Sequence, residues 1–305
     1  VASVSAAIGG AGFAEASAPL EFGGEGPRFA AFKAVDRVGN EEEQKGFSVS
    51  VDSTAPTTRI GFIGAYFLNF NGSGAQPEQA EVFIASTGKV VLTAEDTISQ
   101  GTASGLRELR YRINGGPFTS YAAPFPLAPG LSIVEWFATD RVQNEEPLAS
   151  RRIAVDAQAP VAAFAAGQPK IFIMGVETIT TLSPITLSAQ DTLFAGVAVG
   201  VSRITYRVDG GAEQEYLGAF TLEEGTRELE FGAQDKVLNR EERQKMSLAV
   251  ANFQLAALTA VDRIEVSGTA RIIGPLLSSG PITLNGNVRI EGDALGTPVT
   301  LNGQA

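Results

Sequence analysis

One passage of the sequence occurs three times, and this repeat constrains the fold more than any other feature. The second copy runs from 111 to 145 and the third from 206 to 239, and both open with Tyr-Arg-x-x-Gly-Gly. The first copy matches clearly only at its end, 33–41. The corresponding asparagines lie 104 (144 minus 40) and then 95 (239 minus 144) residues apart. A period near about 100 residues is the length of one β-sandwich domain, so the sequence predicts a tandem array.

The two full copies also carry the signals of strands and tight turns. Apolar and polar residues alternate in 109–113 and 204–208, which is the period of a strand with one buried face. Asn-Gly at 114–115 and Asp-Gly at 209–210 follow, and such pairs supply the positive φ angles of two-residue hairpin turns. We therefore expect antiparallel hairpins in an all-β chain without amphipathic helices.

Proline-containing joints at 52–56 and 156–160 separate the copies. Proline fixes φ and pushes the preceding residue toward extended geometry, so we expect fairly stiff connections. The predicted division is a partial sandwich lacking its first strands at 1–54, complete sandwiches at 55–157 and 158–250, and a different segment at 251–305.

The short first copy leaves room for only part of a sandwich, which would expose apolar faces and unpaired strand edges. One explanation is that the chain is an excerpt of a longer protein. A second is that another molecule supplies the missing strands and so builds a polymer. A third is a divergent or smaller first domain.

The pattern changes after about residue 250. Residues 266–272 resemble 284–290 at an offset of 18 (284 minus 266), and 282–286 recurs as 299–303 at an offset of 17 (299 minus 282). Short strands at this period, with glycine at the corners, predict the coils of a β-solenoid, and a small β-hairpin cap is the alternative. The stretch 286–293 resembles a coil of bactofilin-type solenoids.

Taken in order, these elements resemble the bacterial Ig-like repeats of surface and secreted proteins. That pattern is Tyr-x-x-Asp-Gly-Gly, a Tyr, Pro-Phe-x-Leu, a Gly, Ala-x-Asp-x-x-Gly-Asn-x-Glu and an Asp-x-Thr-x-Pro joint, and it covers residues 1–250 apart from the opening of the first copy. The resemblance implies tandem, exported Ig-like β-sandwiches used for adhesion, matrix binding or spacing, or attached to a secreted enzyme. It implies no catalytic residues. Gln143 and Leu238 replace the glycine of the pattern, which puts the geometry of that turn in question.

The composition removes several classes of function. The chain has no histidine and no cysteine, which excludes histidine-based triads, histidine-ligated zinc and thiolate chemistry, whereas carboxylate-only chemistry as in glycosidases survives. The net charge of −11 repels nucleic acid and anionic lipid headgroups. No apolar run approaches the ~20 residues that a membrane helix needs. We predict a non-enzyme without catalytic or cofactor-binding residues, nucleic-acid partner or membrane span.

Acidic and amide side chains recur in the turn that ends each copy, and they allow two interpretations. The turn residues are Asp36, Asp140 and Asp235 with Asn40, Asn144 and Asn239. Further oxygen ligands could come from Asp52, Asp156, Glu95, Asp96 and Asp191. Oxygen ligands near domain joints suit calcium. Alternatively, each side chain hydrogen-bonds the backbone of its own turn. We predict the second role and no metal site, and calcium stays the alternative.

Adjacent acidic residues could also be read as catalytic carboxylate pairs. They lie at 41–43, 145–146, 223–224 and 241–242. Neighbouring side chains on a strand point to opposite faces, and most of these pairs fall at the same loop of successive copies. We therefore assign them to solvated turns.

An aromatic insertion in the second copy is a candidate carbohydrate platform. It contains Tyr66, Phe67 and Phe70 beside Asn69 and Asn71. Core packing or contact between domains would explain the same aromatics. The Gly-Ser-Gly loop at 72–74 is no phosphate cradle, because neither Lys-Ser/Thr nor a helix follows it.

We expect a non-catalytic structural or adhesive element of a secreted or cell-surface bacterial protein, with either another protein or a surface glycan as its partner. One form would be a filament subunit that self-associates through its incomplete ends and is completed by strands from a neighbour. The alternative is a glycan-binding accessory module of a secreted enzyme.

Overall fold

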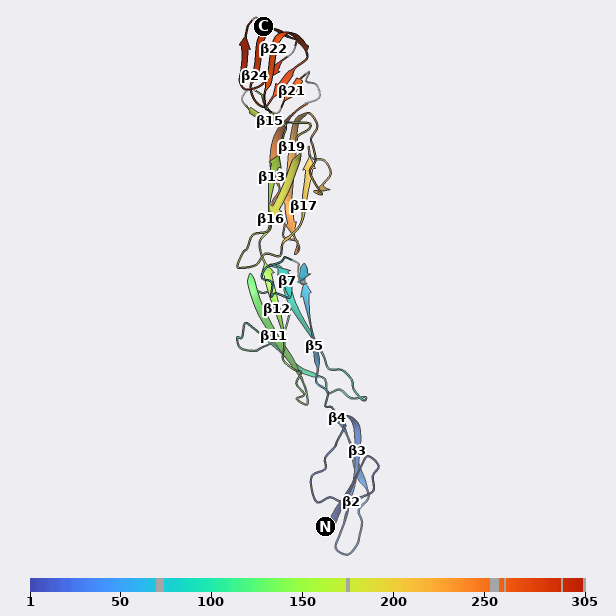
Figure 1. The fold of residues 1–305 in the computed structure, drawn as a ribbon. Coiled ribbons are helices and arrows are strands. Elements are labelled where there is room, and N and C mark those ends of the chain that lie inside the picture. Colours follow the sequence, from blue (N-terminus) through green and yellow to red (C-terminus); the bar gives the residue numbers. More distant parts are fainter. Residues whose placement is uncertain (70–73, 174–175, 253–257, 261, 292, 304–305) are drawn as a thin grey trace. The chain divides into compact units, whose positions relative to one another are not determined.

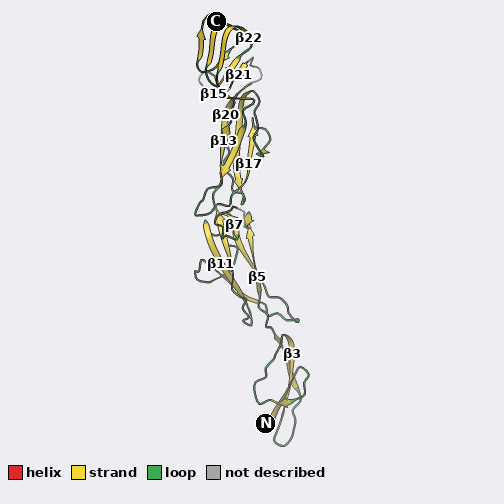
Figure 2. Cartoon of the chain, in the orientation of Figure 1, coloured by secondary structure: helices red, strands yellow, loops and turns green. Residues whose placement is uncertain are grey.

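The structure is a computed structural model that describes residues 1–305 apart from 70–73, 174–175, 253–257, 261, 292 and 304–305. Every regular element in this described part of the chain is a β-strand, and none is a helix (Figure 1, Figure 2). The predicted all-β fold class is thereby confirmed. The chain divides into two compact units: the first unit holds Val1–Ala65 and Gln79–Val155, and the second holds Tyr66–Glu78 and Asp156–Ala305.

The first copy of the repeat is a single antiparallel sheet within the first unit. Its strands, in spatial order, are β2 (Ala14–Glu15), β1 (Ser3–Ile8), β3 (Gly26–Val35) and β4 (Lys45–Val51). Among the described residues 1–54 no second sheet packs against it. Alternate side chains point to opposite faces of a strand. Phe29 pairs with Ser48, and Phe47 pairs with Ala30. Both phenylalanines therefore remain about half exposed, on opposite faces.

The second copy is a sandwich of two sheets in the first unit. One sheet contains β5 (Thr57–Ile63) and β8 (Lys89–Glu95). The other runs through β10 (Thr119–Ser120), β9 (Leu106–Ile113), β11 (Gly130–Asp140), β12 (Ala149–Asp156) and β7 (Val82–Ala85). Val90 and Leu92 of the first sheet meet Val134, Trp136 and Ile153 of the second in one core. Burying each such side chain contributes about 1.5–3 kcal/mol, so this core holds the sheets together.

The third copy repeats this arrangement in the second unit. One sheet pairs β13 (Val161–Ala166) with β16 (Ile185–Gln190). The other contains β14 (Lys170–Ile173), β15 (Val176–Thr180), β20 (Gln244–Ala251), β19 (Gly225–Asp235), β17 (Val201–Val208) and β18 (Gln214–Glu215). In this sheet β15 pairs with β20 in parallel, and the other neighbouring strands are antiparallel. Ile185 and Leu187 pack against Leu229 and Phe231 between the sheets.

Both full copies have the predicted hairpin turn after the alternating strand. Asn114 has a φ of 51° and Gly115 one of 71°, while Asp209 and Gly210 have φ angles of 52° and 69°. These positive angles are those of a two-residue turn whose twist matches that of the flanking strands. The Asn-Gly and Asp-Gly pairs are therefore the local cause of the two hairpins.

The insertion of the second copy belongs to the second unit. It includes β6 (Tyr66–Leu68). Gln76 and Ala198 exchange backbone hydrogen bonds of 2.7 and 3.0 Å. The Lys236 ammonium lies 4.8 Å from the centre of the Phe67 ring. The segment Tyr66–Glu78 thus packs on the third copy, within the second unit.

The C-terminal segment consists of parallel ladders. One ladder joins β21 (Leu258–Ala260), β23 (Leu276–Ser278) and β25 (Ala294–Leu295), and the other joins β22 (Ile264–Ile273), β24 (Ile282–Glu291) and β26 (Val299–Asn302). Ile264 pairs with Ile282, and Ile282 pairs with Val299, at the offsets of 18 and 17 read from the sequence. Gly286 has a φ of 95°, and a Cβ there would lie 2.7 Å from the Gly268 carbonyl oxygen, so only glycine fits this corner. A hairpin cap would need antiparallel pairing. The resemblance to bactofilin-type coils stays a prediction.

Candidate functional site

The aspartate of each repeat turn caps its own loop. In the third copy, Asp235 Oδ1 accepts hydrogen bonds from the backbone N–H groups of Val237 (2.9 Å) and Asn239 (2.8 Å). Its Oδ2 accepts a third from Asn239 Nδ2 at 2.7 Å. Asp36 and Asp140 accept the equivalent three hydrogen bonds. The predicted turn-capping role is confirmed in all three copies.

The turn keeps its shape where the glycine of the pattern is missing. Gly39 has a φ of 89°, and the residues in its place, Gln143 and Leu238, have φ angles of 76° and 69°. A side chain in this left-handed region costs roughly 1–2 kcal/mol. The capping hydrogen bonds therefore hold two residues in a conformation that they disfavour.

Two of the three turn aspartates also belong to clusters of carboxylates. We call Asp52, Asp96 and Asp140 the first cluster, and Asp156, Asp191 and Asp235 the second cluster. Within each cluster, one carboxylate oxygen from each residue lies within 4.8 Å of the others. Each cluster lies entirely within one unit. The sequence had named all six residues among possible calcium ligands, and the structure brings them together three by three.

In the first cluster, loop backbone groups hold the joint aspartate and the loop aspartate. Asp52 Oδ2 accepts a hydrogen bond from Ser104 N at 2.5 Å, and Asp96 Oδ2 accepts one from Gly105 N at 2.6 Å. The Asp52 backbone carbonyl accepts Asn144 Nδ2 at 3.1 Å. The loop that follows β8 and the turn that follows β11 are thus both bonded to the joint residue.

The second cluster repeats these bonds at the corresponding positions. Asp156 Oδ2 accepts Val199 N at 2.8 Å, and Asp191 Oδ2 accepts Gly200 N at 2.6 Å. The Asp156 carbonyl accepts Asn239 Nδ2 at 3.2 Å. Two copies of the repeat therefore build the same polar arrangement from equivalent residues.

Burial changes the proton affinity of the second cluster. Asp235 and Asp156 are almost completely buried. Burial raises the pKa of Asp235 from 3.8 to about 6, partly offset by hydrogen bonds from Asn239 and increased further by the Asp156 charge. Burial also raises the pKa of Asp156 and of Asp191. In the first cluster, burial pushes the pKa of Asp52 upward, but hydrogen bonds with Ser104, Thr54 and Asp140 together outweigh it, so that pKa is lowered from its ordinary value.

One carboxylate oxygen in each cluster has no hydrogen-bond donor. Oδ1 of Asp96 and Oδ1 of Asp191 are both buried from solvent and accept no hydrogen bond. A buried carboxylate oxygen without a partner is costly, unless a cation or a proton satisfies it. The chemistry that three carboxylates support is the binding of a hard cation through oxygen.

Two of the acidic residues assigned to solvated turns have a structural role that the sequence did not reveal. Thr58 N on β5 donates to Glu146 Oε2 at 2.8 Å, and Ala162 N on β13 donates to Glu241 Oε2 at 2.9 Å. The assignment to solvated turns is wrong for these two, because each anchors the first strand of its repeat. Their partners are 88 and 79 residues away in sequence, which no local pattern indicates.

The structure describes part of the aromatic insertion that was considered as a carbohydrate platform. Tyr66 is half exposed, whereas Phe67 packs against Lys236. Phe70 and Asn71 lie outside the described residues, as do Gly72 and Ser73 of the loop. Glycan binding at this segment stays a prediction.

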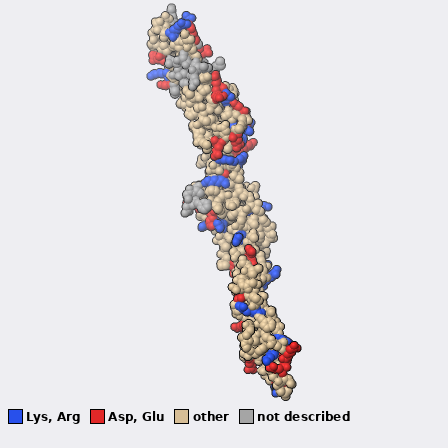
Figure 3. Space-filling view, turned by 90° about the vertical axis from the view of Figure 1, so that its right-hand side faces the viewer, with Lys and Arg blue, Asp and Glu red and all other residues tan. Residues whose placement is uncertain are grey.

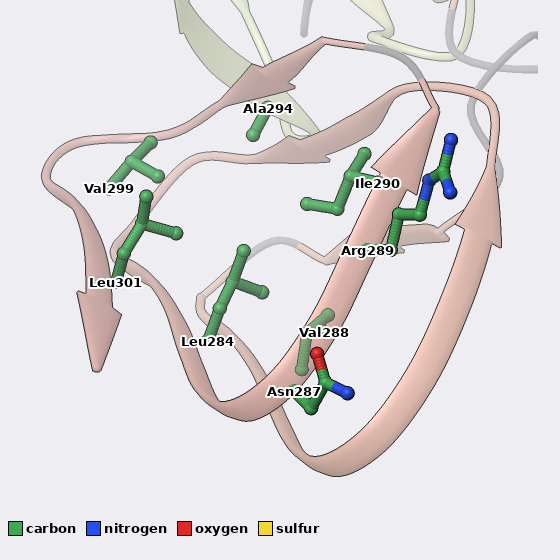
Figure 4. A pocket seen from close by; sticks show the side chains of 8 residues that line it. All are labelled: Leu284, Asn287, Val288, Arg289, Ile290, Ala294, Val299 and Leu301. Atoms are coloured by element: carbon green, nitrogen blue, oxygen red, sulfur yellow. The ribbon is translucent and has the colours of Figure 1, made fainter. Parts of the chain in front are cut away.

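A cavity of about 590 Å³ lies among β24, β25 and β26 (Figure 4). Six apolar and two polar residues line it: Leu284, Asn287, Val288, Arg289, Ile290, Ala294, Val299 and Leu301. On the face drawn in Figure 3, acidic and basic side chains lie next to one another, so the net charge of −11 forms no single acidic patch there. The described part of the chain contains no helix that is long and apolar enough to cross a bilayer.

Comparison with known proteins identifies no family. No family model and no curated protein matches the chain. The chain is similar to the fibronectin(III)-like modules of CbhA from Clostridium thermocellum, at 12% identity and a TM-score of 0.33, over 59% of this chain and 95% of that one. It is similar to the FN1–FN3 domains of chicken CNTN1, at 9% identity and a TM-score of 0.29, over 81% and 91%. It is also similar to the D00–D0 domain of intimin, at 13% identity and a TM-score of 0.23, over 63% and 100%. Similarities this low carry no argument about function.

Proposed function

We propose that this chain is a non-catalytic structural or adhesive element of a secreted or cell-surface bacterial protein. The observation that carries the proposal is the joint that the structure contains twice. In both copies a linker aspartate is bonded to two loops of the repeat that follows it, through Ser104 and Asn144 or through Val199 and Asn239. A chain that uses buried polar groups to fix each linker residue on the repeat that follows it is suited to spacing or presentation.

The exposed sheet of residues 1–54 supports a further step of the proposal. Its half-exposed Phe29 and Phe47 lie on opposite faces, so a second sheet packed on either face would bury one of these apolar side chains. Strands from a neighbouring copy would supply that sheet and lead to a filament, and strands from another stretch of the same polypeptide would supply it without one. Static light scattering over a range of concentrations separates these two sources. A monomer at every concentration would remove the filament form.

The location and the role are tested together on the source bacterium. Antibodies against the second unit should label intact cells or the culture medium, and the isolated chain should bind an immobilised protein or glycan of the host surface. Labelling only after cell lysis would contradict the proposal. Hydrolase activity that depends on a single named carboxylate would contradict its non-catalytic part.

Glycan binding is tested separately, with a glycan array. If a glycan array retains the chain, Tyr66→Ala should abolish retention, because Tyr66 is the exposed aromatic of the described insertion residues. Retention that is unchanged in this variant would place the glycan elsewhere.

A further inference from the structure

The two aspartate clusters contain more carboxylates than are needed to fix the linker residue on the repeat. Hydrogen bonds alone would fix the joint residue, as the backbone bonds from Ser104 and Val199 already do. The loop and turn aspartates nevertheless converge on it in both copies. We propose that each cluster is a Ca²⁺ site, so that the chain binds two Ca²⁺ ions.

The unpartnered oxygens are the first argument for an ion. In Asp96 and in Asp191, Oδ2 accepts a backbone N–H, whereas Oδ1 is buried and accepts nothing. The same atom of the equivalent residue is left without a donor in two copies that differ in sequence around it. A lone pair kept unsatisfied twice at the same position indicates a ligand to a cation.

The charge balance is the second argument. Three carboxylates lie together in each cluster, and Asp140, Asp156 and Asp235 are at most 1% exposed. Beside the second cluster, the Lys236 ammonium acts electrostatically on Asp191. One ammonium leaves two of three negative charges unbalanced. A divalent cation would neutralise these two, which makes the ionised cluster stable at neutral pH.

The donor set selects the metal. All the donors are hard oxygens, which suit Ca²⁺ or Mg²⁺ and not soft transition metals. Ca²⁺ accepts irregular sets of ligands at about 2.3–2.6 Å, so oxygens on opposite sides of the ion stand roughly 4.6–5.2 Å apart. Within each cluster the three carboxylate oxygens lie within 4.8 Å of one another, close enough for all three to contact one such ion. Mg²⁺ needs near-octahedral ligands at about 2.0–2.1 Å and gives up its water reluctantly, so carboxylates fixed by backbone hydrogen bonds favour the less demanding Ca²⁺.

Bound Ca²⁺ would connect the linker to the repeat that follows it. Asp52 lies in the linker, whereas Asp96 and Asp140 belong to the loop after β8 and to the turn after β11. The first copy contains only the turn residue, Asp36, because it has no strand equivalent to β8 from which a loop aspartate could come. Among the described residues, Asp36 therefore belongs to no such cluster.

Calcium titration of the full chain tests the inference. After treatment with a chelator, isothermal titration calorimetry should show two Ca²⁺ per chain, with dissociation constants of about 10⁻⁴ M, the range of extracellular calcium modules. Asp96→Asn and Asp191→Asn should each bind one ion, and the double variant none. Asp36→Asn, the matched turn residue outside the clusters, should still bind two. Fewer than one ion per wild-type chain, or two ions in the double variant, would overturn the proposal.

Thermal unfolding separates a metal ligand from a merely structural residue. Asparagine keeps an oxygen for the Gly200 N–H and turns an amide donor toward the neighbouring carboxylates. In chelator, Asp191→Asn should therefore melt at or above the wild-type temperature. At Ca²⁺ concentrations about 100-fold above Kd, the wild type should gain on the order of 10 °C in the transition that the variant affects, and the variant should gain nothing. A variant that is less stable than wild type by the same amount in both conditions would contradict the calcium site.

The last measurement compares Mg²⁺ with Ca²⁺, and its result does not depend on whether the chain is adhesive. Mg²⁺ at the same concentration should give a clearly smaller thermal shift than Ca²⁺. An equal shift would overturn the assignment to Ca²⁺. Loss of host-surface binding with calcium stoichiometry intact would count only against the proposed function.

Discussion

The turn that ends the first copy and the turn that ends the third are built from the same residues but lie in opposite environments. Asp36 and Asp235 accept the same three hydrogen bonds. Val38 is 83% exposed, whereas Val237, at the equivalent position, is 1% exposed. The pKa of Asp36 is lowered, whereas that of Asp235 is raised to about 6. The hydrogen bonds of the turn are thus set by local sequence, and its electrostatics by what packs over it.

The glutamate six residues after each aspartate shows how a turn becomes part of a joint. In the third copy, Glu241 accepts backbone N–H groups from Ala162 on β13 and from Ala233. In the first copy, Glu42 reaches only Lys45, at 3.2 Å. The first copy has no strand equivalent to β13 among its described residues. A preceding strand, and not the turn itself, therefore gives this carboxylate its buried role.

The largest effect expected from this contrast is a stability that depends on pH with opposite sign at the two turns. In chelator, the folded chain holds the Asp235 proton more tightly than the unfolded chain, chiefly because Asp235 is buried. The tighter binding of this proton adds up to roughly 3 kcal/mol to the free energy of unfolding. This stabilisation is complete below pH 3.8 and is lost as the pH rises through about 6. Asp156 and Asp191 act in the same direction, and Lys236 opposes the effect at Asp191.

At the first turn, hydrogen bonds from Asn40 hold the pKa of Asp36 below its usual value, so stability there is lost as pH falls. Hydrogen exchange of β19 and β3, corrected for the intrinsic effect of pH, measures the two responses separately. Asp235→Asn should flatten the response of β19 and leave that of β3 unchanged. The same sign at both turns would show that burial does not control this difference.

Truncating the valine of the turn should give the next largest difference. Val237→Ala removes two buried methyl groups and should destabilise the third copy by about 2 kcal/mol. Val38→Ala should stay within about 0.5 kcal/mol of wild type, because water already surrounds that side chain. Urea unfolding, followed by hydrogen exchange in each copy, measures both changes. Equal losses would mean that the first turn is covered in solution.

How much of the structure can be predicted from the sequence depends on how far apart in the sequence the interacting residues lie. The hairpins after Asn114 and Asp209 and the capping by Asp235 depend on residues within a few positions, and the sequence predicted them. The clusters depend on residues separated by more than 30 positions, such as Asp156, Asp191 and Asp235. The sequence named these ligands but favoured the local alternative, because both roles use the same side chain. Only the packed loops show that the turn aspartate lies beside the other two carboxylates of its cluster.

The glutamate contrast should give a smaller effect. Glu241→Gln keeps one oxygen for the β13 backbone but turns an amide toward the Gln244 side chain, which now donates to Glu241 Oε1 at 2.7 Å. The loss of this hydrogen bond should cost about 1 kcal/mol. Glu42→Gln loses only an exposed ion pair and should cost nothing measurable. Urea unfolding of the two variants measures both changes, and a Glu241→Gln chain as stable as the wild type would mean that the Gln244 hydrogen bond contributes nothing.

The smallest effect concerns the left-handed residue of the turn, and here the expected sign reverses. Leu238 has a φ of 69° and is 60% exposed, so its side chain adds strain and little burial. Leu238→Gly relieves that strain but gives the unfolded chain more freedom, and the balance should stabilise the third copy by about 0.5 kcal/mol. The reverse change, Gly39→Leu, places a side chain at a φ of 89° where nothing lies within 4 Å of a Cβ, so backbone strain alone should destabilise the first copy. Urea midpoints of the two variants measure both signs, and a Leu238→Gly chain that is less stable than wild type would mean that the leucine makes contacts that outweigh its strained backbone.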